Sequence, residues 1–344
     1  MKEISMYTLI RKLTACLSVS GRETAVSEKI SQIMKEYVDD IYRDNLGSLI
    51  AVKYADGKNC SQDGKKKIML CAHMDEIGFM VTFIEDSGYI RLAPIGGVNL
   101  TACAYSNVIF ENGTRGVLIP EAKKKPSEYR ADMFYVDIGA SSKKEAEKKV
   151  KIGDCFAIEP SLKRLCGKKV CGRPLDDRVG CAVMIDIARK LCDGSVKLDS
   201  DVYFVFSVQE EVGCRGAKPA AFGISPDYAL VFDVTGTGDC IGDSHMALSV
   251  GKGAAVKIKD MSVICNTEVV DKLFALAQEK GIKHQCEILT YGGTDTSAIQ
   301  MTGVGCRVGA ISIPTRYIHT GVETIDIGDA EACSALAVEF IRGI

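Results

Sequence analysis

The sequence predicts an α/β fold with a mixed, largely parallel sheet, into which a small β-rich domain is inserted. Its 344 residues exceed the usual length of one domain, which indicates one large domain or a domain that carries an insertion. After about residue 172, apolar runs typical of buried strands alternate with helical patterns, as in parallel sheets. Between residues 78 and 171 the apolar stretches are short and separated by turn signals, which is typical of a β-rich unit.

The first 76 residues supply the beginning of the larger domain. Two helices are expected in the first thirty-odd residues, and Ser20-Gly-Arg-Glu23 has the form of a capping box that starts the second helix. A β-hairpin with its turn at residues 44–47 is expected next. The apolar run at residues 68–72 is typical of a buried strand, and it ends at His73.

The later elements alternate between helix and strand. Helices are expected at residues 179–191, 269–278 and 330–341, and buried strands at residues 202–206, 228–232 and 308–313. We therefore predict that residues 1–76 and 172–344 form one domain. Residues 77–171 are predicted to form the inserted β-rich domain.

Composition and charge exclude several classes of protein. With 47% hydrophobic and 26% charged residues, the chain is typical of an ordinary globular protein. A net charge of -2 provides no general attraction for nucleic acid or for an anionic membrane, so neither is an expected partner. Charged residues interrupt the apolar runs near the N-terminus, which argues against a signal peptide or a membrane span there. We expect a cytoplasmic protein.

The chain has 15 cysteines, but their pattern does not indicate disulfides. Their number is odd, their spacing is irregular, and no Cys-x-x-Cys pair occurs. Several of them, including Cys71 and Cys181, lie inside apolar runs, where a reduced thiol behaves as a small hydrophobic side chain.

Potential metal ligands follow the predicted core strands. Four of these strands run into such residues: His73 and Asp75, Glu210 and Glu211, Asp233, and His319. Since ligands of open α/β sheets bind beyond the carboxyl ends of the strands, these side chains are expected to meet in one crevice, which Asp176 and Asp177 can join. Two histidines with several carboxylates suit zinc, cobalt or manganese and contain too many oxygens for a structural zinc site.

Each of these residues alone has a simpler explanation. Asp176 and Asp177 can cap a helix, and the paired glutamates can lie in a solvated turn. The occurrence of potential ligands at the ends of four strands together favours a metal site. His245 and His284 follow no core strand, and we interpret both as structural.

Five segments in this order resemble metallopeptidase family 42: Ala72–Phe79 (AHMDEIGF), Leu175–Cys181 (LDDRVGC), Val208–Gly213 (VQEEVG), Gly292–Asp295 (GGTD) and Ile313–His319 (IPTRYIH). That family contains the tetrahedral aminopeptidases, the glutamyl aminopeptidases and members once labelled endoglucanase. The resemblance covers nearly the whole chain. It implies a zinc-peptidase-like catalytic domain that holds two metals, interrupted by a small β-rich domain used for assembly.

Carried over position by position, the resemblance implies a role for each candidate residue. His73 and Asp233 would bind one metal, Glu211 and His319 the other, and Asp176 would bridge the two. Glu210 would be the general base. Asp75 is similar to the carboxylate that orients a metal-bound histidine ring. Asp177 would orient neighbouring groups without binding a metal.

The resemblance also implies the activity, the cofactors and the partners. It points to an aminopeptidase that removes N-terminal residues from short peptides through a water activated by two divalent metals, zinc or cobalt first and manganese next. It implies a homo-oligomer, a dodecamer built from dimers. Many relatives carry a histidine shortly after the segment matching Arg115–Pro120, whereas residues 121–126 here contain none, so subunit contacts or the pocket can differ.

Three alternatives remain at this stage. The same metal ligands suit a deacylase or carboxypeptidase acting on another amide. A noncatalytic scaffold would not need to retain Glu210 and every ligand. A glycosidase normally relies on a carboxylate pair without a metal-bound water, which makes the endoglucanase label the weakest of the three. The sequence does not define the preferred N-terminal residue.

Overall fold

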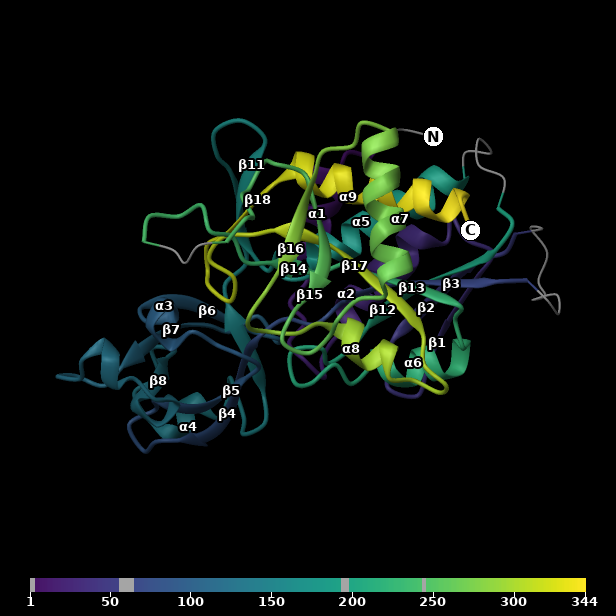
Figure 1. Cartoon of the computed structure of the whole chain (residues 1–344). Coiled ribbons are helices and arrows are strands. Elements are labelled where there is room, and N and C mark those ends of the chain that lie inside the picture. Colours follow the sequence, from purple (N-terminus) through teal and green to yellow (C-terminus); the bar gives the residue numbers. More distant parts are fainter. Residues whose placement is uncertain (1–3, 56–64, 193–197, 243–245) are drawn as a thin grey trace.

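The structure is a computed structural model that describes residues 4–55, 65–192, 198–242 and 246–344. Figure 1 shows a larger body of helices and strands and, beside it, a smaller unit made mainly of strands. None of the helices in the described ranges is both long enough and apolar enough to cross a lipid bilayer.

A mixed, largely parallel sheet forms the centre of the larger body. Within the described residues it has nine strands: β1 (Asp40–Arg43), β2 (Leu49–Lys53), β3 (Lys67–His73), β12 (Asp201–Ser207), β13 (Tyr228–Val231), β14 (Val234–Thr235), β15 (Ala254–Lys259), β16 (His284–Ile288) and β17 (Arg307–Pro314). The order is β1-β2-β12-β3-β13-β17-β15-β16, with β14 beside β17. The central pairs β12–β3, β3–β13 and β13–β17 are parallel. The predicted fold class is confirmed.

Helices cover both faces of this sheet, which explains why its central strands are apolar throughout. The helices of the larger body are α1 (Met6–Thr14), α2 (Thr24–Met34), α5 (Arg178–Cys192), α6 (Ala217–Ile224), α7 (Thr267–Glu279), α8 (Asp295–Gln300) and α9 (Ile327–Arg342). Helices α5 and α9 pack against each other over the sheet, and α6 packs against α8 on the opposite side (Figure 1). All residues of β12 are buried as a result.

The smaller unit is a closed antiparallel barrel. Its strands are β4 (Gly78–Ile84), β5 (Ile90–Ile95), β6 (Ser106–Phe110), β7 (Arg115–Pro120), β8 (Phe134–Asp137) and β9 (Cys155–Ile158), and the order around the barrel is β4-β5-β8-β7-β6-β9. Short helical turns connect them: α3 (Leu100–Cys103), η1 (Pro126–Glu128), η2 (Ala131–Met133) and α4 (Lys143–Ala146). Buried phenylalanines fill the interior, and the Phe156 ring centroid lies 5.2 Å from that of Phe79 and 4.7 Å from that of Phe110.

A three-stranded sheet joins the end of the insertion to the C-terminal part of the chain. It has the order β10 (Ser161–Arg164), β11 (Lys169–Arg173) and β18 (Glu323–Asp326). The barrel strands lie within the predicted inserted domain. The limits of that domain, residues 77 and 171, stay a prediction.

The predicted hairpin at residues 44–47 is confirmed, but the capping box is wrong. Strands β1 and β2 pair antiparallel around that turn. Helix α2 begins at Thr24 without a side-chain cap. Ser20 instead donates its hydroxyl to Asp75 Oδ2 at 2.6 Å, and Glu23 Oε1 accepts the amide of Gln209 at 3.2 Å. Both side chains therefore bond residues of the candidate site described next or of the loop that carries it.

Candidate metal centre

The predicted metal ligands meet in one cleft at the carboxyl ends of the central strands. His73 is the last residue of β3, Asp233 lies between β13 and β14, and His319 follows β17. The cleft has a volume of about 520 Å³, and six of the seven candidate residues line it: His73, Asp176, Glu210, Glu211, Asp233 and His319. The convergence expected from the strand ends is therefore present in the structure.

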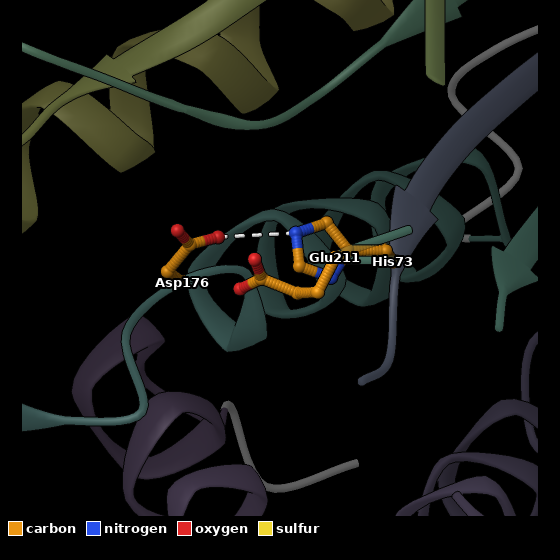
Figure 2. Close-up of side chains that lie close together, drawn as sticks. All are labelled: His73, Asp176 and Glu211. Atoms are coloured by element: carbon orange, nitrogen blue, oxygen red, sulfur yellow. Dashed lines mark hydrogen bonds and ion pairs between the residues drawn. The ribbon is translucent and has the colours of Figure 1, made fainter. Parts of the chain in front are cut away.

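Asp176 lies between the two histidines. Its Oδ1 is 3.0 Å from His73 Nε2, and its Oδ2 is 3.3 Å from His319 Nε2. A further carboxylate approaches the same nitrogen of each ring, since Asp233 Oδ1 is 3.8 Å from His73 Nε2 and Glu211 Oε2 is 3.2 Å from His319 Nε2. Figure 2 shows the imidazole of His73 directed at Asp176, with the carboxylate of Glu211 beside them. One carboxylate thus faces two imidazoles through different oxygens.

Both imidazole rings are oriented by acceptors on Nδ1. His73 Nδ1 lies 3.2 Å from the carbonyl of Asp75, and His319 Nδ1 lies 2.8 Å from the carbonyl of Gly97. A carbonyl oxygen only accepts, so each Nδ1 donates to it, and Nε2 is the ring nitrogen that faces the carboxylates of the cleft. This is the orientation that a metal-binding histidine requires.

Gly97 is a contact that the sequence did not reveal. It lies just after β5, so it comes from the insertion and contacts a residue of the larger body. A Cβ atom at this position would lie 3.0 Å from His319 Nδ1, closer than ordinary van der Waals contact. The only sign of this contact in the sequence is the Gly96-Gly97 pair, since adjacent glycines allow another group to approach the backbone closely.

Asp75 connects His73 to the loop that carries the two glutamates. Its Oδ1 accepts the amide of Glu210 at 3.0 Å, and its Oδ2 accepts the amide of Glu211 at 3.2 Å and the hydroxyl of Ser20. Burial acts to raise the pKa of Asp75, but His73 and these donors outweigh it, and the pKa lies below its usual value. Asp75 is therefore a fixed anion beneath the cleft.

Glu323 is a second residue that sequence reasoning missed. Its Oε2 accepts the amides of Leu175 and Asp176 at 2.6 and 3.2 Å, and its Oε1 accepts the amide of His319 at 3.1 Å. Burial, with the nearby charge of Asp176, raises the pKa of Glu323 to about 8. It positions the backbone of two candidate ligands. The available signal was an acidic residue at the start of a buried strand.

The loop after β12 holds Glu210 in a fixed conformation. Gln209 and Cys214 adopt positive φ angles of 57° and 51°, which are uncommon for residues with side chains and occur often at functional sites. The thiol of Cys214 lies 3.2 Å from Glu210 Oε1, to which it donates a hydrogen bond. The amide of Cys214 bonds the carbonyl of Glu210 at 2.9 Å. Glu210 is thus restrained at both its backbone and its side chain.

The donor atoms of the cleft fit divalent cations. Ligand atoms of His73, Asp176 and Glu211 lie within 4.8 Å of one another, and so do those of a second group, His73, Asp177 and Asp233. Burial is the main cause that raises the pKa of Asp177, Glu210 and Asp233 well above the usual range, and nearby carboxylates add to it. Glu211 Oε1 and Asp177 Oδ2 are buried without a hydrogen-bond partner among the described residues. Cations would satisfy this crowded set of anions.

Among the remaining histidines and cysteines of the described ranges, His284 does not line the cleft, whereas Cys240 lines it and the Cys181 thiol donates to the carbonyl of His73 at 3.1 Å. His284 begins β16, and its Nδ1 lies 2.9 Å from the carbonyl of Ile282. His245 lies outside the described residues. Every cysteine in the described ranges is a free thiol, as expected.

Comparison with known proteins defines the family. A family model described as M42 glutamyl aminopeptidase matches residues 47–336. The chain belongs to the M42 family of aminopeptidases. A putative aminopeptidase of Acetivibrio thermocellus is 44% identical, and the match covers 99% of this chain and 100% of the relative.

Solved structures of similar peptidases have the same fold. Aminopeptidase APDkam598 from the archaeon Desulfurococcus kamchatkensis superposes with a TM-score of 0.92 at 36% identity, covering 98% of this chain and 95% of that chain. The TET1 peptidase of Pyrococcus horikoshii, which can assemble into a tetrahedron or a large octahedral shell, has a TM-score of 0.86 at 32% identity, with 98% and 99% covered. The M42 resemblance stated from the five sequence segments is confirmed.

Proposed function

We propose that this M42 aminopeptidase hydrolyses the N-terminal residue of short peptides by means of a water activated by two divalent cations. The observation that carries the proposal is the position of Asp176, one oxygen of which faces His73 and the other His319. This is the arrangement expected of a carboxylate that bridges two cations.

Each ligand has an assigned place in this proposal. His73 and Asp233 would hold one cation, Glu211 and His319 the other, with Asp176 shared. Bound cations of this kind lower the pKa of a shared water and polarise the scissile carbonyl. Zinc or cobalt suits this nitrogen and oxygen set best, and manganese is the next choice. Asp177 also belongs to a cation-sized group with His73 and Asp233, and we assign it to orienting its neighbours because its Oδ1 accepts the amide of Gly180 at 3.0 Å.

Glu210 is the proposed general base. It lines the cleft, and none of the described hydrogen bonds joins it to His73 or His319. Its Oε1 accepts a hydrogen bond from the Cys214 thiol. From this position its carboxylate would take the proton of the attacking water and deliver it to the leaving amine. Asp75 acts through His73 and the glutamate loop as a positioning residue, so the substrate needs no contact with it.

Assembly into a homo-oligomer, a dodecamer, belongs to the same proposal. A related TET1 structure contains a dodecamer. Residues 121–126 lack the histidine found in many relatives, yet Glu121 is anchored in the barrel, since Arg91 donates to its Oε1 at 2.8 Å. We propose a cytoplasmic location because the described cysteines are free thiols, which a reducing compartment preserves.

A panel of aminoacyl amides and their N-acetylated counterparts tests the direction of cleavage. The aminopeptidase requires a free α-amino group, since a substrate ammonium finds negative partners in the carboxylate-rich cleft. We expect hydrolysis of the free amides only. Equal hydrolysis of both series would favour the deacylase alternative, and loss of C-terminal residues from peptides would favour a carboxypeptidase.

A further inference from the structure

The cleft extends beyond the proposed cation ligands, and a peptide held by the proposed cations would direct its first side chain into this extension. We call it the side-chain wall. Its neutral members include Thr235, Thr237, Leu289 and Tyr291, and its cationic members are Lys257 and Arg316. Whether those two cations are free decides which side chains the wall can bind.

Lys257 is fully engaged inside the protein. Only 1% of the residue is exposed, and its Nζ lies 2.8 Å from Asp260 Oδ2 and 3.1 Å from Glu287 Oε1. Both carboxylates are buried as well. A substrate carboxylate would have to displace one of two buried anions, which makes Lys257 unsuitable as a specificity group.

Arg316 is also engaged. Its Nε donates to Asp239 Oδ1 at 2.9 Å and its Nη2 to Asp239 Oδ2 at 2.6 Å, which is the bidentate geometry that uses the guanidinium fork most completely. Asp239 is held in turn by the hydroxyl of Thr237 at 2.8 Å and the amide of Val250 at 3.0 Å. The pair therefore contributes no net charge to the wall.

The negative charges of the cleft are also compensated once the proposed cations are bound. The four carboxylates that line it, Asp176, Glu210, Glu211 and Asp233, would be matched by two divalent cations. Apart from these four carboxylates, which also face the α-ammonium of the substrate, the described lining residues include no acidic side chain for a basic substrate residue, and both cations of the wall are paired. A charged side chain entering the wall would lose water without gaining a partner.

Two neutral residues of the side-chain wall, Tyr291 and Leu289, also favour a neutral substrate side chain. A Cβ atom at Gly236 would lie 2.5 Å from the hydroxyl oxygen of Tyr291, so the tyrosine packs directly on the glycine backbone. Leu289, which is 7% exposed, adds an aliphatic surface nearby. Both residues line the cleft, and the tyrosine ring and the leucine side chain are its apolar lining there.

We infer that this site selects a neutral, aliphatic N-terminal residue and disfavours both acidic and basic ones, although the matching family model is described by glutamyl specificity. The inference rests on the proposed function, because it assumes that the cleft binds the substrate's first residue. It is tested by comparing kcat/KM for leucyl, glutamyl and lysyl amides of one fluorophore. We expect the leucyl amide to exceed each charged amide by about tenfold or more.

The Asp239→Asn variant tests the role of the paired arginine. Removing the negative charge frees Arg316 for a substrate carboxylate, so the ratio of glutamyl to leucyl kcat/KM should rise by about tenfold. The matched control is Asp132→Asn on the barrel, where Arg130 makes the same two bonds at 3.2 and 3.0 Å far from the cleft. In that variant the ratio should not change.

Three results would count against the inference. A wild-type enzyme that cleaves the glutamyl or lysyl amide as fast as the leucyl amide overturns it, whether or not the Asp239 variant folds. A folded Asp239→Asn protein with an unchanged ratio overturns the assignment of Arg316. Failure to cleave any free aminoacyl amide would refute the proposed function itself and the specificity with it.

Discussion

The barrel and the cleft end of the large sheet are both buried, but they contain opposite kinds of side chain. The barrel interior is apolar, with Phe79, Phe110, Phe134 and Phe156 almost completely buried. The cleft end buries carboxylates, and some of their oxygens have no partner among the described residues. Burying apolar surface stabilises a fold, whereas burying unpaired charge costs stability. The difference indicates that the barrel side chains stabilise the protein, while the buried carboxylates of the cleft agree with the cation binding that we propose for them.

The largest expected effect tests the catalytic half of this comparison. Glu210→Gln keeps the shape of the side chain but cannot take up a proton, so kcat should fall by about 10²- to 10⁴-fold. Activity assays and elemental analysis on the same sample provide the measurement, and the cation content should stay unchanged. Near-normal turnover in the cation-loaded variant would move the base elsewhere, with Glu211 or Asp75 the next candidates.

Replacing ligands separates the two proposed cation sites. Asp176→Ala removes the shared ligand and should weaken binding of both cations, whereas His319→Ala should weaken mainly one. Titration of the metal-free proteins with zinc measures both effects. Equal losses in the two variants would contradict the assignment of Asp176 as the bridge.

Truncating the barrel core should affect stability and leave the cleft intact. Phe156→Ala removes a buried ring that contacts two others, and we expect a loss of about 3–5 kcal/mol in the free energy of unfolding. Phe222→Ala is the control, because that side chain is 72% exposed. Denaturant unfolding measures both. If Phe156→Ala abolished cation binding in folded protein, the two regions would not be separable.

The smallest expected effect concerns the contact between the regions. Gly97→Ala places a methyl group 3.0 Å from His319 Nδ1, so the ring must shift, and one cation should bind about tenfold more weakly. Gly223→Ala is the matched control, since a Cβ there meets no atom within 4 Å. Unchanged cation affinity in Gly97→Ala would show that the His319 ring tolerates the shift.

The sequence predicted the cleft residues better than it predicted their supports. His73, Asp233 and His319 were found because each follows an apolar run, and strand ends of a parallel sheet meet at one edge. Gly97 and Glu323 were missed because their contacts join segments far apart in the chain, and no periodicity marks such contacts. The Ser20 capping box failed because the hydroxyl finds a buried carboxylate, Asp75, as a stronger partner than a backbone amide. The short apolar stretches between residues 78 and 171 predicted a β-rich insertion, but they did not predict that its strands close into a barrel.

The most direct test of this account is the number of cations bound per chain. Purified protein is stripped with a chelator, incubated with excess zinc or cobalt, freed of unbound metal, and measured by elemental analysis with circular dichroism as the check of folding. The account predicts two divalent cations per chain, because the carboxylates and histidines of the cleft provide ligands for two and remain partly unsatisfied without them. Folded protein that retains almost no metal would contradict it.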